Sequence, residues 1–104
     1  MSKTKRGEVW LADLGLAAKV RPVLVVSIPF GDLDYALVTV IPHTTIPRGS
    51  NFEVSLPLPY LQKGAFNIQG ALAIPEAKFI RRLGTLSPDQ LTQVTNTLKR
   101  WLGF

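Results

Sequence analysis

Four residues in two short segments carry side chains suited to reactions at phosphorus: Arg21, His43, Thr44 and Thr45. Arg21 has a permanently charged guanidinium whose planar fork can hold two phosphate oxygens, and Pro22 beside it restricts the local backbone. The two threonines offer hydroxyl groups, and the histidine has an ordinary pKa near neutrality. Together these groups could stabilise negative charge and move a proton at a phosphate ester.

Each of these residues also has a structural interpretation. Arg21 could form a surface ion pair with Asp13 or Glu8. The two threonines could hydrogen-bond the backbone at the end of a strand, where threonine is common. A lone histidine is often structural, and alternation along a strand could turn it away from Thr44. The residues alone leave both interpretations open.

Four further basic residues are candidates for holding an extended polyanion such as RNA: Lys19, Arg48, Arg81 and Arg82. Lys19 and Arg48 are expected in loops beside the Arg21 and Thr44 segments. Arg81 and Arg82, with Lys78, could equally form a solvated patch. The basic residues are spread along the chain, which favours a folded groove over a disordered basic arm.

Composition limits the classes of protein and of site. The chain has 104 residues, a length typical of one domain, so residues 1–104 are predicted to form a single domain. It has no cysteine and one histidine, so no metal site of the usual zinc type is expected. No apolar run is long enough to cross a membrane, and a cytoplasmic protein is expected. The formal charge of +5 favours an acidic partner.

The hydrophobic pattern predicts a mainly β protein. Five segments of the chain show either the apolar–polar alternation or the β-branched content that is typical of strands. Turns with proline or glycine separate these segments. Tyr35–Ile41 is expected to end at Pro42, which places His43 and Thr44 at a reachable strand exit. Residues 77–83 fit either a strand or a short helical turn. The predicted strands are Gly7–Leu14, Val20–Ser27, Tyr35–Ile41, Asn51–Leu56 and Phe66–Ile74.

One helix is predicted at the end of the chain. Ser87 is a favourable N-cap, Pro88 suits the first helical position, and Gln90 completes a capping box. An apolar stripe recurs at helical spacing up to Gly103, a residue that commonly ends helices. The helix is expected to cover a barrel-like sheet through the residues of that stripe: Leu91, Val94, Leu98, Trp101 and Leu102.

Several motifs together resemble those of the MazF/PemK toxin family. They appear in the family's order and spacing over nearly the whole chain, although each is common by itself. The family's first strand opens with the pattern seen here at residues 6–10, and its second begins with Arg-Pro-Val-Leu-Val. The motifs are Arg6-Gly7-Glu8-Val9-Trp10, Arg21 to Val25, Thr44-Thr45, Arg48-Gly49-Ser50, Phe52-Glu53-Val54 and Leu83-Gly84-Thr85-Leu86-Ser87.

The resemblance implies a fold and a reaction. The fold is an SH3-like, partly open antiparallel barrel with a C-terminal helix, of the MazF/PemK/CcdB type. The reaction is metal-independent, sequence-specific cleavage of single-stranded RNA, including mRNA, by the ribose 2′-OH. It leaves 2′,3′-cyclic phosphate and 5′-OH ends. Arg21 and Thr44 match the family's catalytic pair, Thr45 and His43 are possible catalytic support, and no cofactor is implied.

The resemblance also implies partners. The chain is expected to act as the toxin of a type II toxin–antitoxin system and to form a homodimer with a concave RNA surface. An acidic antitoxin of the MazE/PemI type is expected to bind across that surface. DNA contact is expected to be weak and to occur only within the toxin–antitoxin complex.

Two departures and one alternative accompany this hypothesis. Only Gly15 to Lys19 separate the first two strands, where the family commonly has a longer loop, so RNA specificity is expected to differ. Residues 69–76 replace a Gln-Ile/Pro-Arg motif of many members, so the contribution of its arginine is missing. The alternative is a non-catalytic protein of the same fold. It would act by protein contact, as a gyrase poison does through its C-terminal helix, or be a decayed RNA-binding module.

Overall fold

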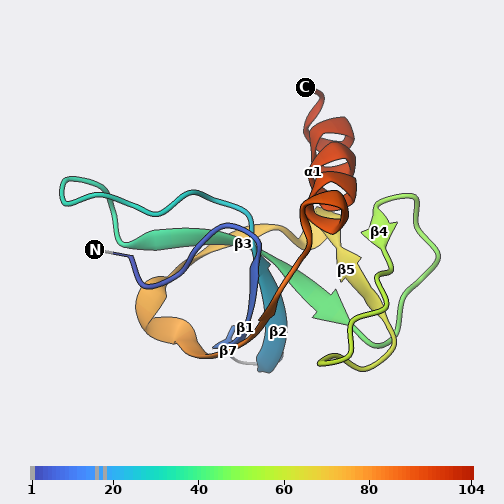
Figure 1. The fold of residues 1–104 in the computed structure, drawn as a ribbon, viewed down its shortest axis with the longest axis horizontal. Helices are drawn as coiled ribbons and strands as arrows, with labels where there is room; N and C mark the ends of the chain where they lie inside the picture. The colour runs from blue at the N-terminus through green and yellow to red at the C-terminus, as the bar shows by residue number, and fades with distance from the viewer. Residues whose placement is uncertain (1, 16, 18) are drawn as a thin grey trace.

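The computed structural model describes residues 2–15, 17 and 19–104. Within these residues the chain forms seven strands and one α-helix (Figure 1). Residues 16 and 18 of the short first connection lie outside the described residues. The elements are β1 (Glu8–Asp13), β2 (Val20–Val25), β3 (Leu37–Thr44), β4 (Glu53–Val54), β5 (Ala65–Asn67), β6 (Leu72–Pro75), β7 (Phe79–Thr85) and α1 (Pro88–Leu102), with 3₁₀ turns η2 (Ile68–Gly70) and η3 (Glu76–Lys78).

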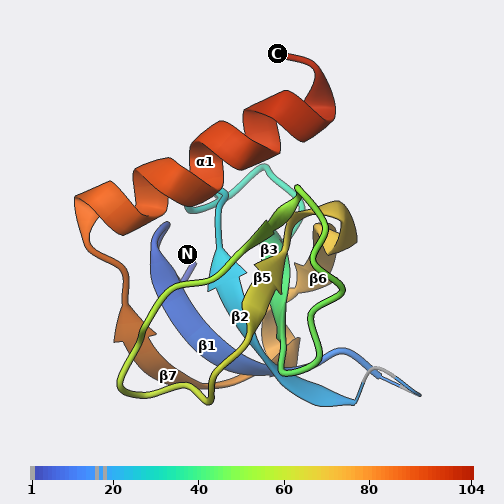
Figure 2. The ribbon, with the colours of Figure 1, turned by 90° about the vertical axis from the view of Figure 1, so that its right-hand side faces the viewer.

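The seven described strands form one strongly curved antiparallel sheet. Six follow the order β4-β5-β3-β2-β1-β7, and β6 pairs with β3. The terminal strands β4 and β7 do not pair with each other, so the sheet is not closed. The helix α1 crosses one end of the sheet (Figure 2). This confirms the predicted mainly β fold, a partly open antiparallel barrel with a C-terminal helix.

The predicted end of the third strand is wrong. β3 does not stop at Ile41 but continues through Pro42 and His43 to Thr44. The reason is long-range pairing: β5 lies beside the end of β3, with His43 opposite Phe66. His43 and Thr44 are therefore held in a strand and not at a loose exit.

The predicted single strand at Phe66–Ile74 is also wrong. The turn η2 divides it into β5 and β6, which pair with different halves of β3. The break lets the chain follow β3 around the curve of the sheet. The predicted strand at Asn51–Leu56 is reduced to β4, whose two residues pair with β5. The ambiguous segment at residues 77–83 becomes mostly the strand β7, after the short turn η3.

The predicted helix and its caps are confirmed. The Ser87 hydroxyl accepts a hydrogen bond from the Gln90 N–H at 3.2 Å, and the Gln90 side chain accepts one from the Ser87 N–H at 2.9 Å. Gly103 ends the helix with a φ of 82°, a left-handed conformation that glycine adopts without strain. Val94 is fully buried, whereas Trp101 and Leu102 at the end of the stripe remain exposed.

Two groups of buried apolar residues lie on the two faces of the curved sheet. One group lies under α1 and includes Leu24, Ile41, Phe66 and Val94. The other lies on the opposite face and includes Phe79. Because β2 and β3 contribute to both groups, they are held from both faces of the sheet and provide a rigid base for Arg21 and Thr44.

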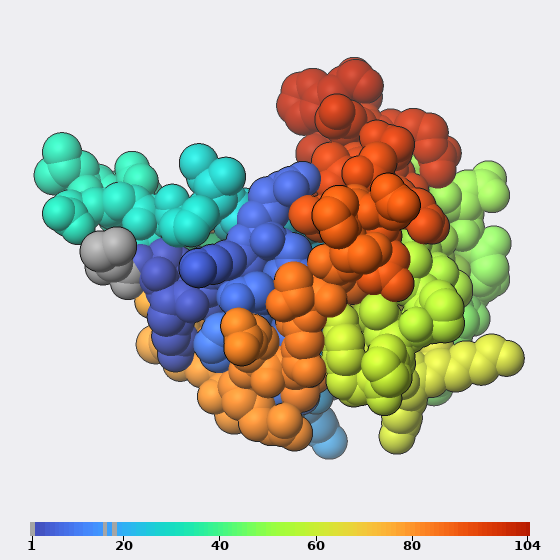
Figure 3. Space-filling view, in the orientation of Figure 1, coloured from blue at the N-terminus to red at the C-terminus, as the bar shows by residue number. Residues whose placement is uncertain are grey.

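Residues 28–37 form an arm that projects from the body of the molecule (Figure 3). It carries several exposed apolar side chains, among them Leu33 and Tyr35. No helix among the described residues is long and apolar enough to cross a membrane.

Candidate functional site

Arg21, His43, Thr44 and Ile46 form a wall between two cavities. The first, the cationic cavity, has a volume of about 490 Å³ and is also lined by Arg81. The second, the amide cavity, has a volume of about 450 Å³. Its other lining residues are Pro42, Arg48, Ser50, Glu53, Asn67 and Gln69. The two residues first assigned to catalysis therefore stand at a boundary that a chain of nucleotides could cross.

Strand pairing fixes the position of Arg21. It is the second residue of β2 and lies opposite Ala12 of β1, and its side chain is half-buried. Pro22 follows it and precedes Val23, the first residue of β2 to pair with β3. The proline thus stands near the strand start, where its missing N–H leaves the β2–β3 ladder intact. The ion pair of Glu8, one of the suggested partners of Arg21, is formed with Arg82.

Thr44 ends β3 and combines a structural contact with access to both cavities. Its hydroxyl oxygen accepts a hydrogen bond from the Ile46 N–H at 3.1 Å, which is the local backbone bond foreseen as the structural interpretation. The hydroxyl proton can still be donated to a ligand. Thr45 is exposed and lines only the cationic cavity of the two.

His43 is buried, with 4% of its surface exposed, yet its side chain contributes to the walls of both cavities. Its ring meets the Phe66 ring edge to face at a centroid distance of 5.0 Å. Burial lowers the pKa of His43 below its ordinary value. The imidazole is therefore neutral at neutral pH, which is the form that can accept a proton.

Arg81 and Arg82 have different surroundings although they are adjacent on β7. Arg81 lines the cationic cavity. Arg82 extends to the other face of the strand, where its Nη1 donates to Glu8 Oε2 at 3.1 Å. Burial alone would raise the pKa of Glu8, but hydrogen bonds from Trp10, the Lys5 N–H and Arg82 outweigh it and lower that pKa. The structure thus brings Arg81 to the site and places Arg82 in an ion pair.

Arg48 lines the amide cavity on a loop held by Glu53. The Glu53 carboxylate accepts the backbone N–H groups of Arg48, Gly49 and Ser50 at 3.0, 2.8 and 2.8 Å. These bonds, the one from Arg48 first, lower the pKa of Glu53. Lys19 is exposed, precedes β2 with a φ of 52°, and is not among the residues that line the described cavities.

Several site residues were missed from the sequence. Asn67 and Gln69 line the amide cavity, and their spacing of two inside an apolar run was a usable signal, since it marks one face of a strand. Tyr60 lines the cationic cavity from an irregular segment, and no pattern pointed to it. Its hydroxyl is buried with no hydrogen-bond partner among the described residues, and burial raises its pKa.

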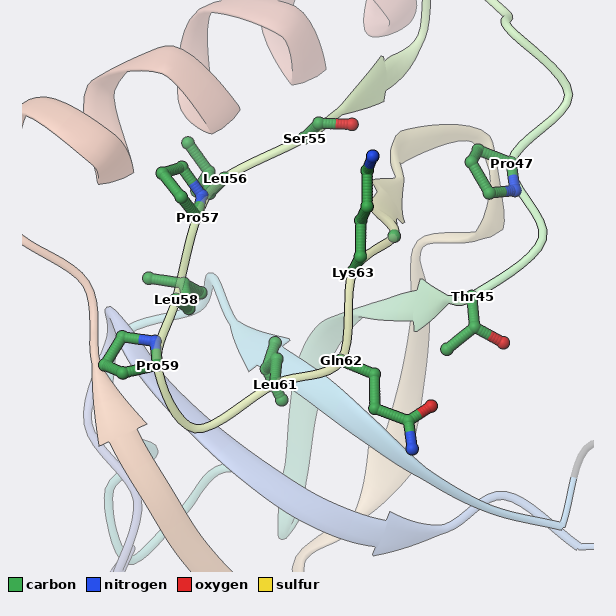
Figure 4. A pocket seen from close by; sticks show the side chains of 11 residues that line it. Thr45, Pro47, Ser55, Leu56, Pro57, Leu58, Pro59, Leu61, Gln62 and Lys63 are labelled. Carbon is green, nitrogen blue, oxygen red and sulfur yellow. The ribbon is translucent and has the colours of Figure 1, made fainter.

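A third and larger hollow, the apolar groove, adjoins the cationic cavity. Its volume is about 970 Å³, and it shares Thr45, Leu61 and Gln62 with that cavity. Figure 4 shows Leu56–Pro59 and Leu61 along one side, Thr45 and Pro47 along the other, and Lys63 between them. No group of histidine, cysteine and acidic side chains within the described part of the chain is arranged to hold a metal ion.

Comparison with solved structures finds the same fold in known proteins. An endoribonuclease from Mycobacterial species has a TM-score of 0.81 and 23% identity, covering 100% of this chain and 95% of that one. An endoribonuclease in complex with its cognate antitoxin, also from Mycobacterial species, has a TM-score of 0.82 and 24% identity, covering 97% and 96%. MazF from Deinococcus radiodurans has a TM-score of 0.80 and 25% identity, covering 97% of each chain.

A family model described as the PemK-like, MazF-like toxin of type II toxin–antitoxin systems matches residues 5–102. The match includes every residue of the two-cavity wall and the whole of α1. The chain is a member of the PemK-like, MazF-like toxin family.

Proposed function

We propose that this chain cleaves single-stranded RNA in a sequence-specific reaction that needs no metal and leaves 2′,3′-cyclic phosphate and 5′-OH ends. One observation carries the proposal. Arg21 and Thr44 share a wall between two cavities, each of a few hundred cubic ångströms, so one phosphate can lie on the wall while its two nucleotides occupy opposite sides. The named endoribonucleases of the same fold support it.

The proposed chemistry uses groups of the wall. The ribose 2′-oxygen attacks phosphorus, the bond from phosphorus to the 5′-oxygen breaks, and the 2′-proton is transferred to a base while the leaving oxygen gains a proton. Arg21 holds the nonbridging oxygens as their negative charge grows, and the Thr44 hydroxyl donates to one of them. Neutral His43 is suited to accept a proton, and Thr45 to hold an oxygen on the cationic side.

We propose that the protein is the toxin of a toxin–antitoxin pair and works in the cytoplasm as a homodimer. An acidic antitoxin of the MazE/PemI type fits the formal charge of +5, and binding across the cationic cavity would exclude RNA. Some of the solved relatives are complexes of MazF with MazE. Any DNA contact belongs to the toxin–antitoxin complex.

A second candidate function rests on the end of α1. Trp101, Leu102 and Phe104 are 43%, 54% and 92% exposed, which suits contact with another protein, as in a gyrase poison. In that case truncation before Trp101 would abolish toxicity, whereas Arg21→Ala would not. The nuclease is preferred because Arg21 and Thr44, the residues suited to hold a phosphate, stand together on the wall between the two cavities.

The experiment is incubation of the purified protein with a long unstructured RNA in EDTA, followed by mapping of the fragment ends. Wild type is expected to cut at defined sequences, and Arg21→Ala to lower the rate by roughly 10²- to 10³-fold, as loss of a main electrostatic group does. Thr44→Ala is expected to lower it by a smaller factor, because a neutral hydroxyl stabilises charge less than a guanidinium.

Matched controls separate catalysis from folding. Arg6→Ala and Thr92→Ala remove the same side chains at exposed positions that line none of the described cavities, and both are expected to cut at the wild-type rate. Intact RNA with wild type, or cleavage unchanged by Arg21→Ala, contradicts the proposal and directs the test to the second candidate.

A further inference from the structure

The two cavities at the wall differ in chemistry. The cationic cavity has Arg81 in addition to Arg21, and no acidic residue is among its described lining. The amide cavity contains one acidic residue, Glu53, opposite one additional cation, Arg48. Its remaining polar side chains are neutral: Ser50, Asn67 and Gln69. Arg21 lines both cavities, so the cationic cavity has two cations and no carboxylate, whereas the amide cavity has two cations and one carboxylate. The cationic cavity is therefore the more favourable place for a phosphate.

Glu53 makes the amide cavity a poor place for a phosphate. Three backbone N–H groups hold its carboxylate and lower its pKa, so it is charged at neutral pH. Like charges repel, and a fixed carboxylate near a phosphodiester is unfavourable. The same carboxylate can accept a hydrogen bond from an amino group. The part of an RNA chain that fits this cavity is therefore a base.

Asn67 and Gln69 supply the groups that read a base. Within the residues that the structure describes, neither side-chain amide has a hydrogen-bond partner. Each amide presents a donor and an acceptor side by side, the arrangement that pairs with the adjacent donor and acceptor of a base edge. Asn67 ends β5 and Gln69 lies in η2, so both stand on the rigid edge that follows β3.

Gly70 leaves room for the Asn67 amide. A Cβ atom built at residue 70 would lie 2.9 Å from Asn67 Nδ2 and 3.1 Å from Pro42 Cγ. Any side chain at residue 70 would therefore displace the amide.

We propose that the amide cavity is a base-recognition subsite, in which Asn67 and Gln69 select the base on one side of the cleaved phosphate. The base is adenine or cytosine, because these two bases carry an amino group where guanine and uracil carry a carbonyl oxygen, and the Glu53 carboxylate accepts from an amino group but repels a carbonyl oxygen. The amino group faces an amide oxygen or Glu53, and the ring nitrogen accepts from an amide N–H. This inference rests on the proposed nuclease function and adds the residues and the class of base.

The test is cleavage of an RNA pool randomised around one central region, with the cut positions read by sequencing of the 5′-OH fragments. Wild type is expected to favour adenine or cytosine at one position next to the cut. Asn67→Ala and Gln69→Ala are each expected to lower that preference by about fivefold or more, the effect of one good base contact, and to leave the other positions unchanged. Asn96→Ala and Gln93→Ala, at exposed sites on α1, are the matched controls.

A second variant moves the amide without deleting it. Gly70→Ala pushes the free end of the Asn67 side chain, which can rotate away, so the fold is expected to persist while the preference at the same position weakens. Thermal unfolding checks that each variant is folded. A wild-type preference for guanine or uracil there, or an amino-base preference that all three variants retain, overturns the inference.

Binding separates failure of this inference from failure of the nuclease proposal. If wild type cuts no RNA, the nuclease proposal fails, and the subsite is judged by fluorescence anisotropy with short RNAs that differ at single positions. Tighter binding of the adenine or cytosine RNAs that Asn67→Ala abolishes supports the subsite. Equal binding of all four bases overturns it.

Discussion

Arg21 and Thr44 illustrate how much a side chain depends on its surroundings. Both types of residue are common on protein surfaces, and Thr44 also makes an ordinary local hydrogen bond with Ile46. What distinguishes them is their position on adjoining strands, where they separate a cavity without a carboxylate from one that contains Glu53. For single residues, the proposed chemistry depends on the charge of Arg21, on the hydroxyl donor of Thr44 and on the burial of His43.

The buried His43 predicts a pH dependence of stability. Burial lowers its pKa in the folded protein below the ordinary value of 6.5, so the unfolded chain takes up the proton first as pH falls. The contribution of neutral His43 to the free energy of unfolding is present above about pH 6.5 and is lost progressively below it. Urea unfolding is expected to show the free energy of unfolding falling between pH 7 and 5. His43→Gln is expected to remove the fall in that window.

Two glutamates, Glu8 and Glu53, make stability depend on pH in a separate and more acidic range. Glu8 and Glu53 have pKa values lowered from 4.5, so their stabilisation is present above about pH 4.5 and is lost as pH falls further. A His43→Gln variant that kept the whole fall between pH 7 and 5 would contradict the assignment to the histidine.

Arg81 and Arg82 give a paired prediction. Arg81→Ala is expected to weaken RNA binding and to reduce the slope of log affinity against log salt by about 0.7, the value for one phosphate contact on a single strand. Arg82→Ala is expected to leave that slope unchanged, because Arg82 is paired with Glu8 on the other face of β7. Anisotropy titrations of a labelled RNA at several salt concentrations test this, and equal slopes for both variants would contradict it.

Among the elements, the irregular segment at residues 55–64 has the largest effect on the site. It forms most of the apolar groove and supplies Tyr60 to the cationic cavity. It has no strand of its own, so contacts hold it: Leu58 is buried, and Tyr60 packs directly on Gly84 of β7. The close approach of Tyr60 to β7 is therefore one of the contacts that position it.

Gly84→Ala tests that approach. The new Cβ would lie 2.7 Å from Tyr60 Cδ1 and closer to two other ring atoms, so the ring and its segment must shift. We expect the free energy of unfolding to fall by about 1–3 kcal/mol, as overpacking does, and RNA cleavage to weaken as well. Gly31→Ala is the control, because its Cβ would meet only Asp34 Oδ2 at an ordinary 3.5 Å. Chemical unfolding with an unchanged midpoint for Gly84→Ala would show that the contact can relax freely.

For the whole molecule, charge and exposed apolar surface determine the expected partners. The formal charge of +5 favours RNA and an acidic antitoxin over neutral ligands. The arm at residues 28–37 exposes Leu33 and Tyr35 at 102% and 86%, which is unusual for a surface that stays in water. Because the arm projects from the body, it can reach a second copy without distortion of the sheet (Figure 3).

We expect sedimentation to give a dimer, twice the chain mass of 11.4 kDa. Replacing both Leu33 and Tyr35 by serine is expected to raise the dimer dissociation constant, because it removes apolar area from the arm. A wild-type monomer at micromolar concentration would contradict the dimer. An unchanged dimer in the double variant would place the interface elsewhere.

Local features of the sequence determined the helix, the first two strands and the set of candidate reactive side chains. The capping box at Ser87 and the apolar stripe act within one helix, so nearby residues are enough to predict them. Alternation likewise predicted β1 and β2, and the Arg-Pro pair indicated a constrained arginine. These properties depend on backbone preferences and on periodicity over a few residues.

Only the tertiary structure decided which of these residues share a site. Pairing of β3 with both β5 and β6 extended β3 to Thr44 and broke the predicted Phe66–Ile74 strand at η2. The same pairing brought Asn67 to the wall, and the faces of β7 separated Arg81 from Arg82. The physical reason is that register and curvature arise from contacts between residues distant in sequence, and no local pattern contains that information.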